Sequence, residues 1–153
     1  MNATESRYVK PQSATSFFND AVARLARMGV SVYGSRILYV RGRTSGEWRS
    51  TPVNPMTLDG VRYLVAPRGN TQWVRNLRAG DGNGELRLGR RVEPFHATEV
   101  PDDRKPAVLR VYLKRWKWEV GAFFEAGISA KSADEALLRI APGYPVFRID
   151  PVR

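Results

Sequence analysis

Cysteine is absent from this chain of 153 residues, and histidine occurs only once, at His96. Without thiols the chain cannot form disulfides, thiolate nucleophiles, zinc knuckles or iron–sulfur clusters. A single imidazole also excludes a multi-histidine metal site within one chain. No apolar run is long enough to span a bilayer, and residues 1–10 lack the apolar segment of a secretory signal. We therefore expect a cytoplasmic protein with no metal centre, and peripheral contact with a membrane stays open as an alternative.

Acidic residues are also scarce, with 15 Asp and Glu against 25 Lys and Arg and a formal net charge of +10. Such a balance indicates an anionic partner: nucleic acid, acidic lipid or a polyanionic small molecule. The length is that of a single domain. We place this domain at residues 15–153, after a flexible N-terminal segment at residues 1–14.

Hydrophobic periodicity divides the chain into strands and short helices. We predict strands at 36–41, 49–58, 61–66, 85–89, 91–100 and 146–149, and helices at 16–29, 71–79, 101–118 and 132–140. Pro52 and Pro55 place the second strand at a sheet edge or a bulge, because proline donates no ladder hydrogen bond. A mostly antiparallel sheet of about six strands with a few helices predicts an α+β fold, a small barrel with flanking helices.

The segment from Gly42 to Pro52 joins the first two predicted strands and combines glycines, short hydroxyl side chains and two arginines. Glycine permits a tight turn and close approach by another molecule. Exposed turn amides can form an anion-binding concavity, and the guanidinium groups of Arg43 and Arg49 match phosphate or carboxylate oxygens. The segment is therefore typical of an anion-receiving turn, with an ordinary hairpin loop as the alternative.

Each of three other features allows more than one interpretation. The helix at 16–29 carries Arg24 and Arg27 beside its apolar stripe, so it can pack on a sheet, which we favour, or lie on an acidic membrane. Basic and aromatic residues alternate at 114–118, which suits nucleic acid, a membrane surface or simply a helix C-terminus. His96 is either a structural strand residue or a proton donor.

Two sequence blocks together resemble a known family. The first is Leu38-Tyr39-Val40-Arg41-Gly42-Arg43-Thr44-Ser45-Gly46, followed by Arg49 and Pro52; the second is Tyr63-Leu64-Val65-Ala66-Pro67-Arg68-Gly69, followed by Trp73, Asn76 and Leu77. Their order and separation resemble the deazaflavin-dependent nitroreductases, also called coenzyme F(420)-dependent quinone reductases. The resemblance implies a split β-barrel, like that of FMN-binding proteins, that binds reduced 8-hydroxy-5-deazaflavin.

The resemblance also implies roles for individual residues. The turn and the arginine after it would hold the phosphodiester and glutamate tail of the coenzyme, and Pro52 would lie near its rings. A strand-end loop and a helix would line the rest of the groove. These cofactor-binding candidates are Arg43, Thr44, Ser45, Gly46, Arg49, Pro52, Ala66, Pro67, Arg68, Gly69, Trp73 and Asn76. The chain departs from the family pattern at Thr44, where many members have lysine, and at Gln72, where nitroimidazole-reducing members have proline.

The implied reaction is hydride transfer from reduced coenzyme F(420) to an electron-poor small molecule: a quinone, an activated enone or a nitro compound. A donor near the acceptor would stabilise the negative charge that develops, and Tyr112, Tyr144 and His96 are candidates for this role. Trp116, Trp118, Phe123 and Phe124 either wall the acceptor pocket or belong to the core.

Three alternatives remain. The same fold could bind FMN instead of the deazaflavin. The protein could hold the coenzyme without turnover. It could also be a non-catalytic basic module for nucleic acid, although we do not expect nucleic acid as its partner.

Overall fold

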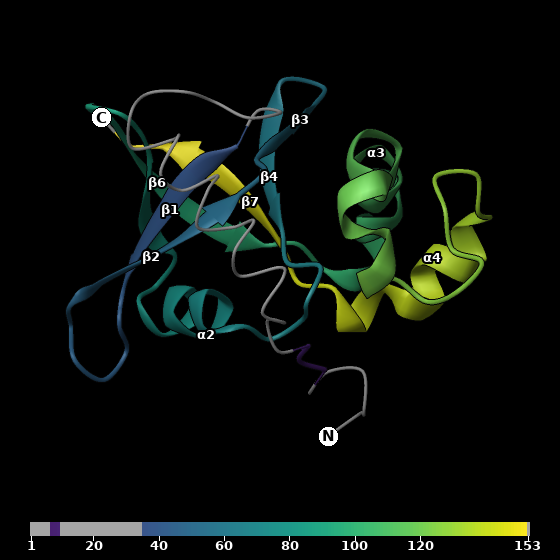
Figure 1. The fold of residues 1–153 in the computed structure, drawn as a ribbon, viewed down its shortest axis with the longest axis horizontal. Helices are drawn as coiled ribbons and strands as arrows, with labels where there is room; N and C mark the ends of the chain where they lie inside the picture. The colour runs from purple at the N-terminus through teal and green to yellow at the C-terminus, as the bar shows by residue number, and fades with distance from the viewer. Residues whose placement is uncertain (1–6, 10–34, 153) are drawn as a thin grey trace.

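The computed structural model of the protein describes residues 7–9 and 35–152 (Figure 1). The predicted helix at 16–29 lies outside the described residues, as do 1–6 and 10–14 of the predicted flexible segment. The described chain forms one curled antiparallel sheet and three α-helices. The predicted split barrel of the α+β class is confirmed.

The sheet has seven strands in the order β2-β1-β5-β6-β7-β4-β3, and every neighbouring pair is antiparallel. The strands are β1 (Arg36–Arg41), β2 (Trp48–Val53), β3 (Met56–Leu58), β4 (Val61–Val65), β5 (Asn83–Leu88), β6 (Arg91–Glu99) and β7 (Val146–Pro151). The predicted strand at 49–58 is thus two strands. β2 and β3 form opposite edges of the sheet, and Asn54 and Pro55 connect them. Pro52 lies on edge strand β2 and pairs with Ile37 of β1. An edge strand suits proline, because proline has no amide hydrogen to donate to a neighbouring strand.

The concave side of the sheet is closed by helix α2 (Gln72–Ala79). The side chains of Leu38 and Val40 alternate with those of Ile37 and Tyr39 along β1, so that one pair faces inward. Val74 and Leu77 of α2 are fully buried against this inner face. Their burial removes apolar surface from water and contributes about 2 kcal/mol per side chain. This contact fixes α2 beside β1 and β2.

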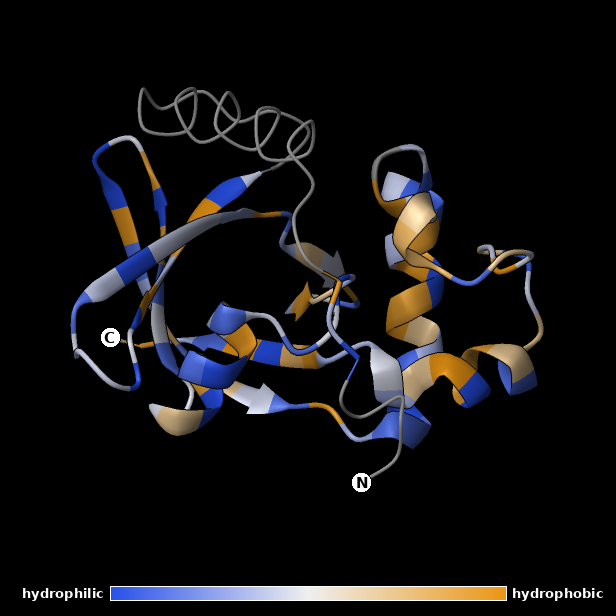
Figure 2. Cartoon of the chain, turned by 60° about the horizontal axis from the view of Figure 1, so that its bottom comes forward, coloured by the Kyte–Doolittle hydropathy of each residue, from blue (hydrophilic) through white to orange (hydrophobic). Residues whose placement is uncertain are grey.

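A second core lies where α3 (Lys105–Val120) and α4 (Asp134–Ile140) pack together next to β3 and β4. The hydrophobic segments of these two helices are neighbours in Figure 2. Trp116 has non-helical backbone angles (φ −127°, ψ 17°), so α3 kinks within the predicted basic and aromatic segment. Short 3-10 turns at Asp102–Arg104, Gly121–Phe123 and Ala141–Gly143 join these elements.

Candidate functional site

The turn between β1 and β2 is tight and exposed. The Gly42 amide donates to the Glu47 carbonyl at 2.8 Å, and the Gly46 amide donates to the Gly42 carbonyl at 2.9 Å. Gly46 has a φ of 72°, a value that glycine adopts without strain. The Ser45 hydroxyl accepts a hydrogen bond from the Glu47 amide at 3.2 Å. Thr44, Ser45 and Gly46 are all exposed, so this turn presents its side chains to solvent.

Arg43 ties the turn to helix α2. Its amide donates to Asn76 Oδ1 at 3.0 Å, and its Nη1 donates to the same oxygen at 2.7 Å. Nη1 also donates to Gln72 Oε1 at 2.9 Å. Asn76 is only 4% exposed, and a buried amide oxygen needs such donors. The sequence departure at Gln72 therefore supplies a further acceptor that holds Arg43 along the helix.

A cleft of about 170 Å³ lies between β2, the start of α2 and the loop after β4. It adjoins the β1–β2 turn through Asn76, which lines the cleft and holds Arg43. Among the described residues, its lining contains no carboxylate. The lining residues are Tyr8, Val40, Arg49, Ser50, Thr51, Arg68, Thr71, Gln72, Trp73 and Asn76.

Arg68 brings a partly desolvated positive charge to the cleft. Burial lowers the pKa of its guanidinium, because the charged form loses hydration; the nearby phenol of Tyr8 opposes this shift. In the described part of the chain Arg68 makes no ion pair, and its Nη1 makes only a long contact of 3.4 Å with the Val9 carbonyl. A half-buried cation without a carboxylate is stabilised by any anion that enters the cleft.

Thr71 adds an unused polar atom at the start of α2. It is the N-cap residue and only 4% exposed, but its side chain makes no capping hydrogen bond. Its Oγ1 has no partner among the described residues. The first amides of a helix also lack internal acceptors and attract negative charge. Thr71, these amides and the two arginines in the lining together fit a group that carries phosphate or carboxylate oxygens.

Trp73 supplies the large apolar surface of the cleft. Its ring packs against Phe147 with 5.9 Å between centroids, which holds it in place. A rigid indole beside an anion site suits a ligand that combines a planar ring system with an acidic tail.

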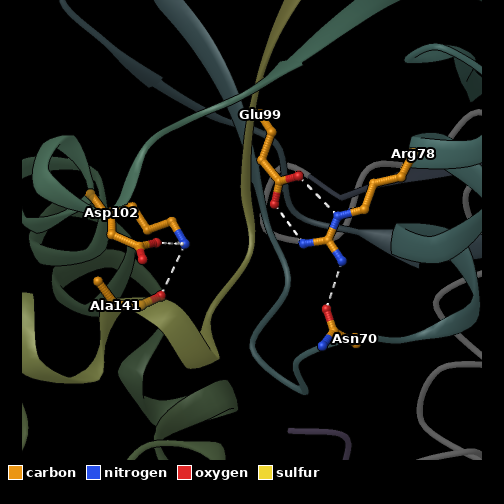
Figure 3. A network of polar contacts seen from close by, with 6 residues as sticks. Asn70, Arg78, Glu99, Asp102 and Ala141 are labelled. Atoms are coloured by element: carbon orange, nitrogen blue, oxygen red, sulfur yellow. Dashed lines mark hydrogen bonds and ion pairs between the residues drawn. The ribbon is translucent and has the colours of Figure 1, made fainter. Parts of the chain in front are cut away.

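Two polar contacts at the far end of α2 fix the helix that carries these groups (Figure 3). Arg78 donates in bidentate fashion to Glu99, at 2.9 and 2.5 Å, and donates to Asn70 Oδ1 at 2.8 Å. Asn70 lies in the loop before α2 and Glu99 ends β6. Arg78 thereby holds both ends of the α2 segment against the sheet.

Of the predicted cofactor-binding residues, the structure brings Arg49, Arg68, Trp73 and Asn76 into the cleft lining. Pro52 lies on β2, and Ala66, Pro67 and Gly69 belong to the loop that presents Arg68. Arg43, Thr44, Ser45 and Gly46 form the adjoining turn. The binding roles of these residues stay predictions.

The candidate catalytic residues lie elsewhere. Tyr112 and Tyr144 are buried in the core around α3 and α4, and the Tyr144 hydroxyl donates to the Phe123 carbonyl at 2.7 Å. His96 is exposed on β6, opposite Asp150 in the ladder. None of the three lines the described part of the cleft.

The four aromatic residues proposed as an acceptor wall also lie outside that lining. Trp116 and Phe124 belong to the α3–α4 core, and Phe123 packs against it. Trp118 is 61% exposed. For Trp116 and Phe124 the structure therefore supports the core interpretation.

Sequence reasoning did not identify Tyr8, Ser50, Thr51 or Thr71 as lining residues. Thr71 starts the helix predicted at 71–79, and Ser50 and Thr51 follow the arginines of the predicted anion-receiving turn. Tyr8 had no local signal, because it reaches the cleft only through pairing with Gly69, far along the chain.

Neither a membrane-spanning helix nor a metal cluster is found in the described part of the chain. None of its helices has the length and apolar character needed to cross a bilayer. Its His, Asp and Glu side chains form no group of three or more that could hold a metal ion.

Solved structures share the fold at low sequence identity. A chain described as a domain-swapped dimer matches with a TM-score of 0.54 and 17% identity over 90% of this chain and 100% of its own. A structure titled F420-H2 Dependent Reductase (FDR-A) has a TM-score of 0.50 and 18% identity over 76% and 94%. The protein Rv2991 from Mycobacterium tuberculosis, described as a conserved hypothetical protein, has a TM-score of 0.50 and 16% identity over 97% and 84%.

Of the two sequence comparisons, one finds a family. The family model described as F420H(2)-dependent quinone reductase matches residues 16–118, about two thirds of the chain. The matched range contains the β1–β2 turn, the loop after β4 and all of α2. No curated protein matches the sequence.

Proposed function

Because the chain belongs to the F420H(2)-dependent quinone reductase family, and is therefore an oxidoreductase, we propose how its cleft serves that activity. We propose that the cleft binds the reduced deazaflavin coenzyme F(420) and that the enzyme passes a hydride to an electron-poor small molecule, with quinones as the first class to test.

The observation that carries this proposal is the chemistry of the cleft lining. Arg49, Arg68 and the hydroxyl of Thr71, which has no partner among the described residues, lie next to the indole of Trp73, and the described lining contains no carboxylate. That set matches a ligand with an anionic tail and a planar ring system, which is the character of the deazaflavin coenzyme. The net charge of +10 favours the same ligand at long range.

Different residues of the cleft and the adjoining turn would bind different parts of the coenzyme. Arg49, Arg68 and the start of α2 bind the acidic part of the coenzyme through charge-assisted hydrogen bonds. Trp73, held by Phe147, orients the rings. Arg43, fixed on Asn76, keeps the turn closed over the tail. When bound, the reduced coenzyme supplies the hydride, so the protein itself needs no metal or acid–base pair.

A binding experiment tests the proposal. The full-length protein is titrated with coenzyme F(420) and, separately, with FMN, and ligand fluorescence is recorded. We expect micromolar or tighter binding of F(420), weaker binding of FMN, and anaerobic oxidation of the reduced coenzyme when a soluble naphthoquinone is added. Tighter FMN binding would favour the FMN-dependent alternative, and binding of neither ligand would reject the proposal. Coenzyme binding without oxidation by any quinone, enone or nitro compound would instead indicate a carrier.

Two variants give the test its internal control. Arg68→Ala removes the half-buried cation of the cleft and is expected to weaken F(420) binding about ten-fold or more. Arg139→Ala removes the same charge from an exposed ion pair with Glu125, remote from the cleft lining, and is expected to leave binding unchanged. Equal weakening in both variants would indicate a non-specific effect of net charge.

A further inference from the structure

A short segment near the N-terminus pairs with the loop that carries Arg68. The Val9 amide donates to the Arg68 carbonyl at 2.8 Å, and the Asn70 amide donates to the Arg7 carbonyl at 2.7 Å. Tyr8 and Gly69 form the antiparallel bridge between these bonds. We name residues Arg7–Val9 the N-terminal strap. It lies before the family-matched range, which starts at residue 16, so the family match does not imply it.

The side chain of Arg7 fastens the strap to three separate parts of the fold. Nη1 donates to the carbonyl of Pro67 at 2.8 Å and to that of Gly143 at 3.2 Å, while Nη2 donates to the Phe123 carbonyl. The guanidinium also lies over the ring of Tyr144, 4.3 Å from its centroid. One arginine fork thus joins the loop after β4 to the turns that follow α3 and α4.

The strap lies directly against the loop backbone at Gly69. This glycine has a φ of 84°, and a methyl group placed on it would lie only 2.1 Å from the Arg7 carbonyl oxygen. The loop therefore cannot take its present form around a larger residue while the strap is in place. Such close main-chain contact fixes the position of the neighbouring residue, Arg68.

The middle residue of the strap faces the cleft. Tyr8 is among the lining residues, together with Arg68 and Trp73. The guanidinium of Arg75 lies over its ring at 5.6 Å, and its phenol is close enough to Arg68 to affect the pKa of that group. Tyr8 therefore adds an aromatic surface and a hydroxyl donor beside the partly desolvated cation.

We propose that the N-terminal strap is a wall of the coenzyme site, in which Tyr8 contacts the bound coenzyme and Arg7 is a positioning residue that holds the Arg68 loop. The proposal rests on the proposed function, because it assigns a further part of the same cleft. It extends the site beyond the family-matched residues and couples coenzyme binding to a segment distant in sequence.

Substitutions at Tyr8 test the contact. We expect Tyr8→Ala to weaken F(420) binding by about 3- to 10-fold, the range of one aromatic contact. Tyr8→Phe keeps the ring and should weaken binding less than Tyr8→Ala does. Tyr63→Phe is the matched control, since that phenol lies outside the described cleft lining. Wild-type affinity in Tyr8→Ala would overturn the contact.

A double-variant cycle tests the positioning role of Arg7. If Arg7 acts through the Arg68 loop, Arg7→Ala weakens coenzyme binding in the wild-type background and much less in the Arg68→Ala background. Fold-changes that simply multiply would overturn the coupling. Arg7→Lys, which keeps the charge but not the planar fork, should fall between wild type and Arg7→Ala.

Amide hydrogen exchange provides a readout that needs no coenzyme. The Asn70 amide is bonded to the Arg7 carbonyl, so Arg7→Ala should accelerate its exchange while amides in the centre of β5 remain protected. If Arg7→Ala does not fold, Arg7→Lys is used in the same measurement, and unchanged exchange in a folded variant counts against the strap.

The two proposals fail in different ways. Failure of the wild-type protein to bind F(420) rejects the proposed function and, with it, the coenzyme contact of Tyr8. Intact wild-type binding with no effect of Tyr8→Ala or Arg7→Ala rejects only the strap as a wall of the site.

Discussion

Asn76 Oδ1 accepts two hydrogen bonds from Arg43, one from its amide at 3.0 Å and one from its guanidinium at 2.7 Å. The two residues come from separate elements, the β1–β2 turn and helix α2. One buried amide oxygen therefore fixes the backbone of the turn and the direction of its arginine at the same time.

Removing this acceptor should cost stability. We expect Asn76→Ala to lower the free energy of unfolding by about 1–3 kcal/mol, because two donors lose their partner beside a buried site. The midpoint of urea unfolding measures the effect. Asn83→Ala is the control, since the exposed side chain of Asn83 donates only to the Gly80 carbonyl among the described residues. Equal midpoints in the two variants would argue against the Arg43–Asn76 contact.

The two turn arginines should weaken tail binding but differ in their effect on stability. We expect Arg43→Ala and Arg49→Ala each to reduce the binding free energy of F(420) by about 1–3 kcal/mol, as lost charge-assisted hydrogen bonds do. Only Arg43→Ala should also lower the unfolding midpoint, because the Arg43 guanidinium holds Asn76, whereas the side chain of Arg49 makes no hydrogen bond or ion pair with the described residues 7–9 and 35–152. Unchanged affinity in both variants would reject the assignment of the turn.

Gly69 and Gly60 form a matched pair of substitutions. Both have positive φ, 84° and 77°, but a methyl group at Gly60 would meet nothing within 4 Å, whereas at Gly69 it would lie 2.1 Å from the Arg7 carbonyl oxygen. We expect Gly60→Ala to lower the free energy of unfolding by about 1 kcal/mol, because of the backbone conformation alone. Gly69→Ala should lower it clearly more and should also weaken coenzyme binding. Thermal unfolding and the fluorescence titration measure the two effects, and equal costs at both positions would contradict the close approach of the strap.

Tyr144 should make stability fall at alkaline pH. Burial raises the pKa of its phenol above the ordinary value of about 10, with Arg7 opposing the shift. The folded state then retains the proton that the unfolded state releases, so this contribution is complete below pH 10 and declines as the pH rises toward the folded-state pKa. We expect Tyr144→Phe to lower the free energy of unfolding by about 1 kcal/mol near neutral pH, because the hydrogen bond to the Phe123 carbonyl is lost. Above pH 10 the free energy of unfolding of this variant, measured with urea, should decline less steeply with pH than that of the wild type. The same pH dependence in both proteins would contradict a raised pKa of Tyr144.

The strands and the glycine turn were predictable because their signals are local. Alternation along β1, the Asp59-Gly60 turn between β3 and β4, and Pro52 on β2 fix structure within a few residues. The split of the predicted strand at 49–58 was not predictable, because only the closure of the sheet decides that β2 and β3 pair with different partners at opposite edges.

The start of α4 and the wall of the cleft also show where prediction from local sequence ends. Ser132 and Glu135 have the spacing of a capping box, but α4 begins after Ala133, and the Ser132 hydroxyl accepts the Ser129 amide instead at 2.9 Å. Arg43, Arg49, Arg68 and Trp73 could be named from the sequence because their blocks resemble a family. Tyr8 could not, since its place depends on a bridge to Gly69 across about sixty residues.

The position of β7 has a consequence for how the chain reaches its final form. It is the last of the seven described strands in chain order, yet it lies between β6 and β4, where it joins the ribbon β2-β1-β5-β6 to the hairpin β4-β3. Until β7 leaves the ribosome, the described sheet consists of two unconnected pieces, each with an open edge that invites pairing with another chain. The pairing of β4 with β7 joins segments far apart in the sequence, and such non-local pairing slows folding, so we expect the partly synthesised chain to be the form most exposed to aggregation.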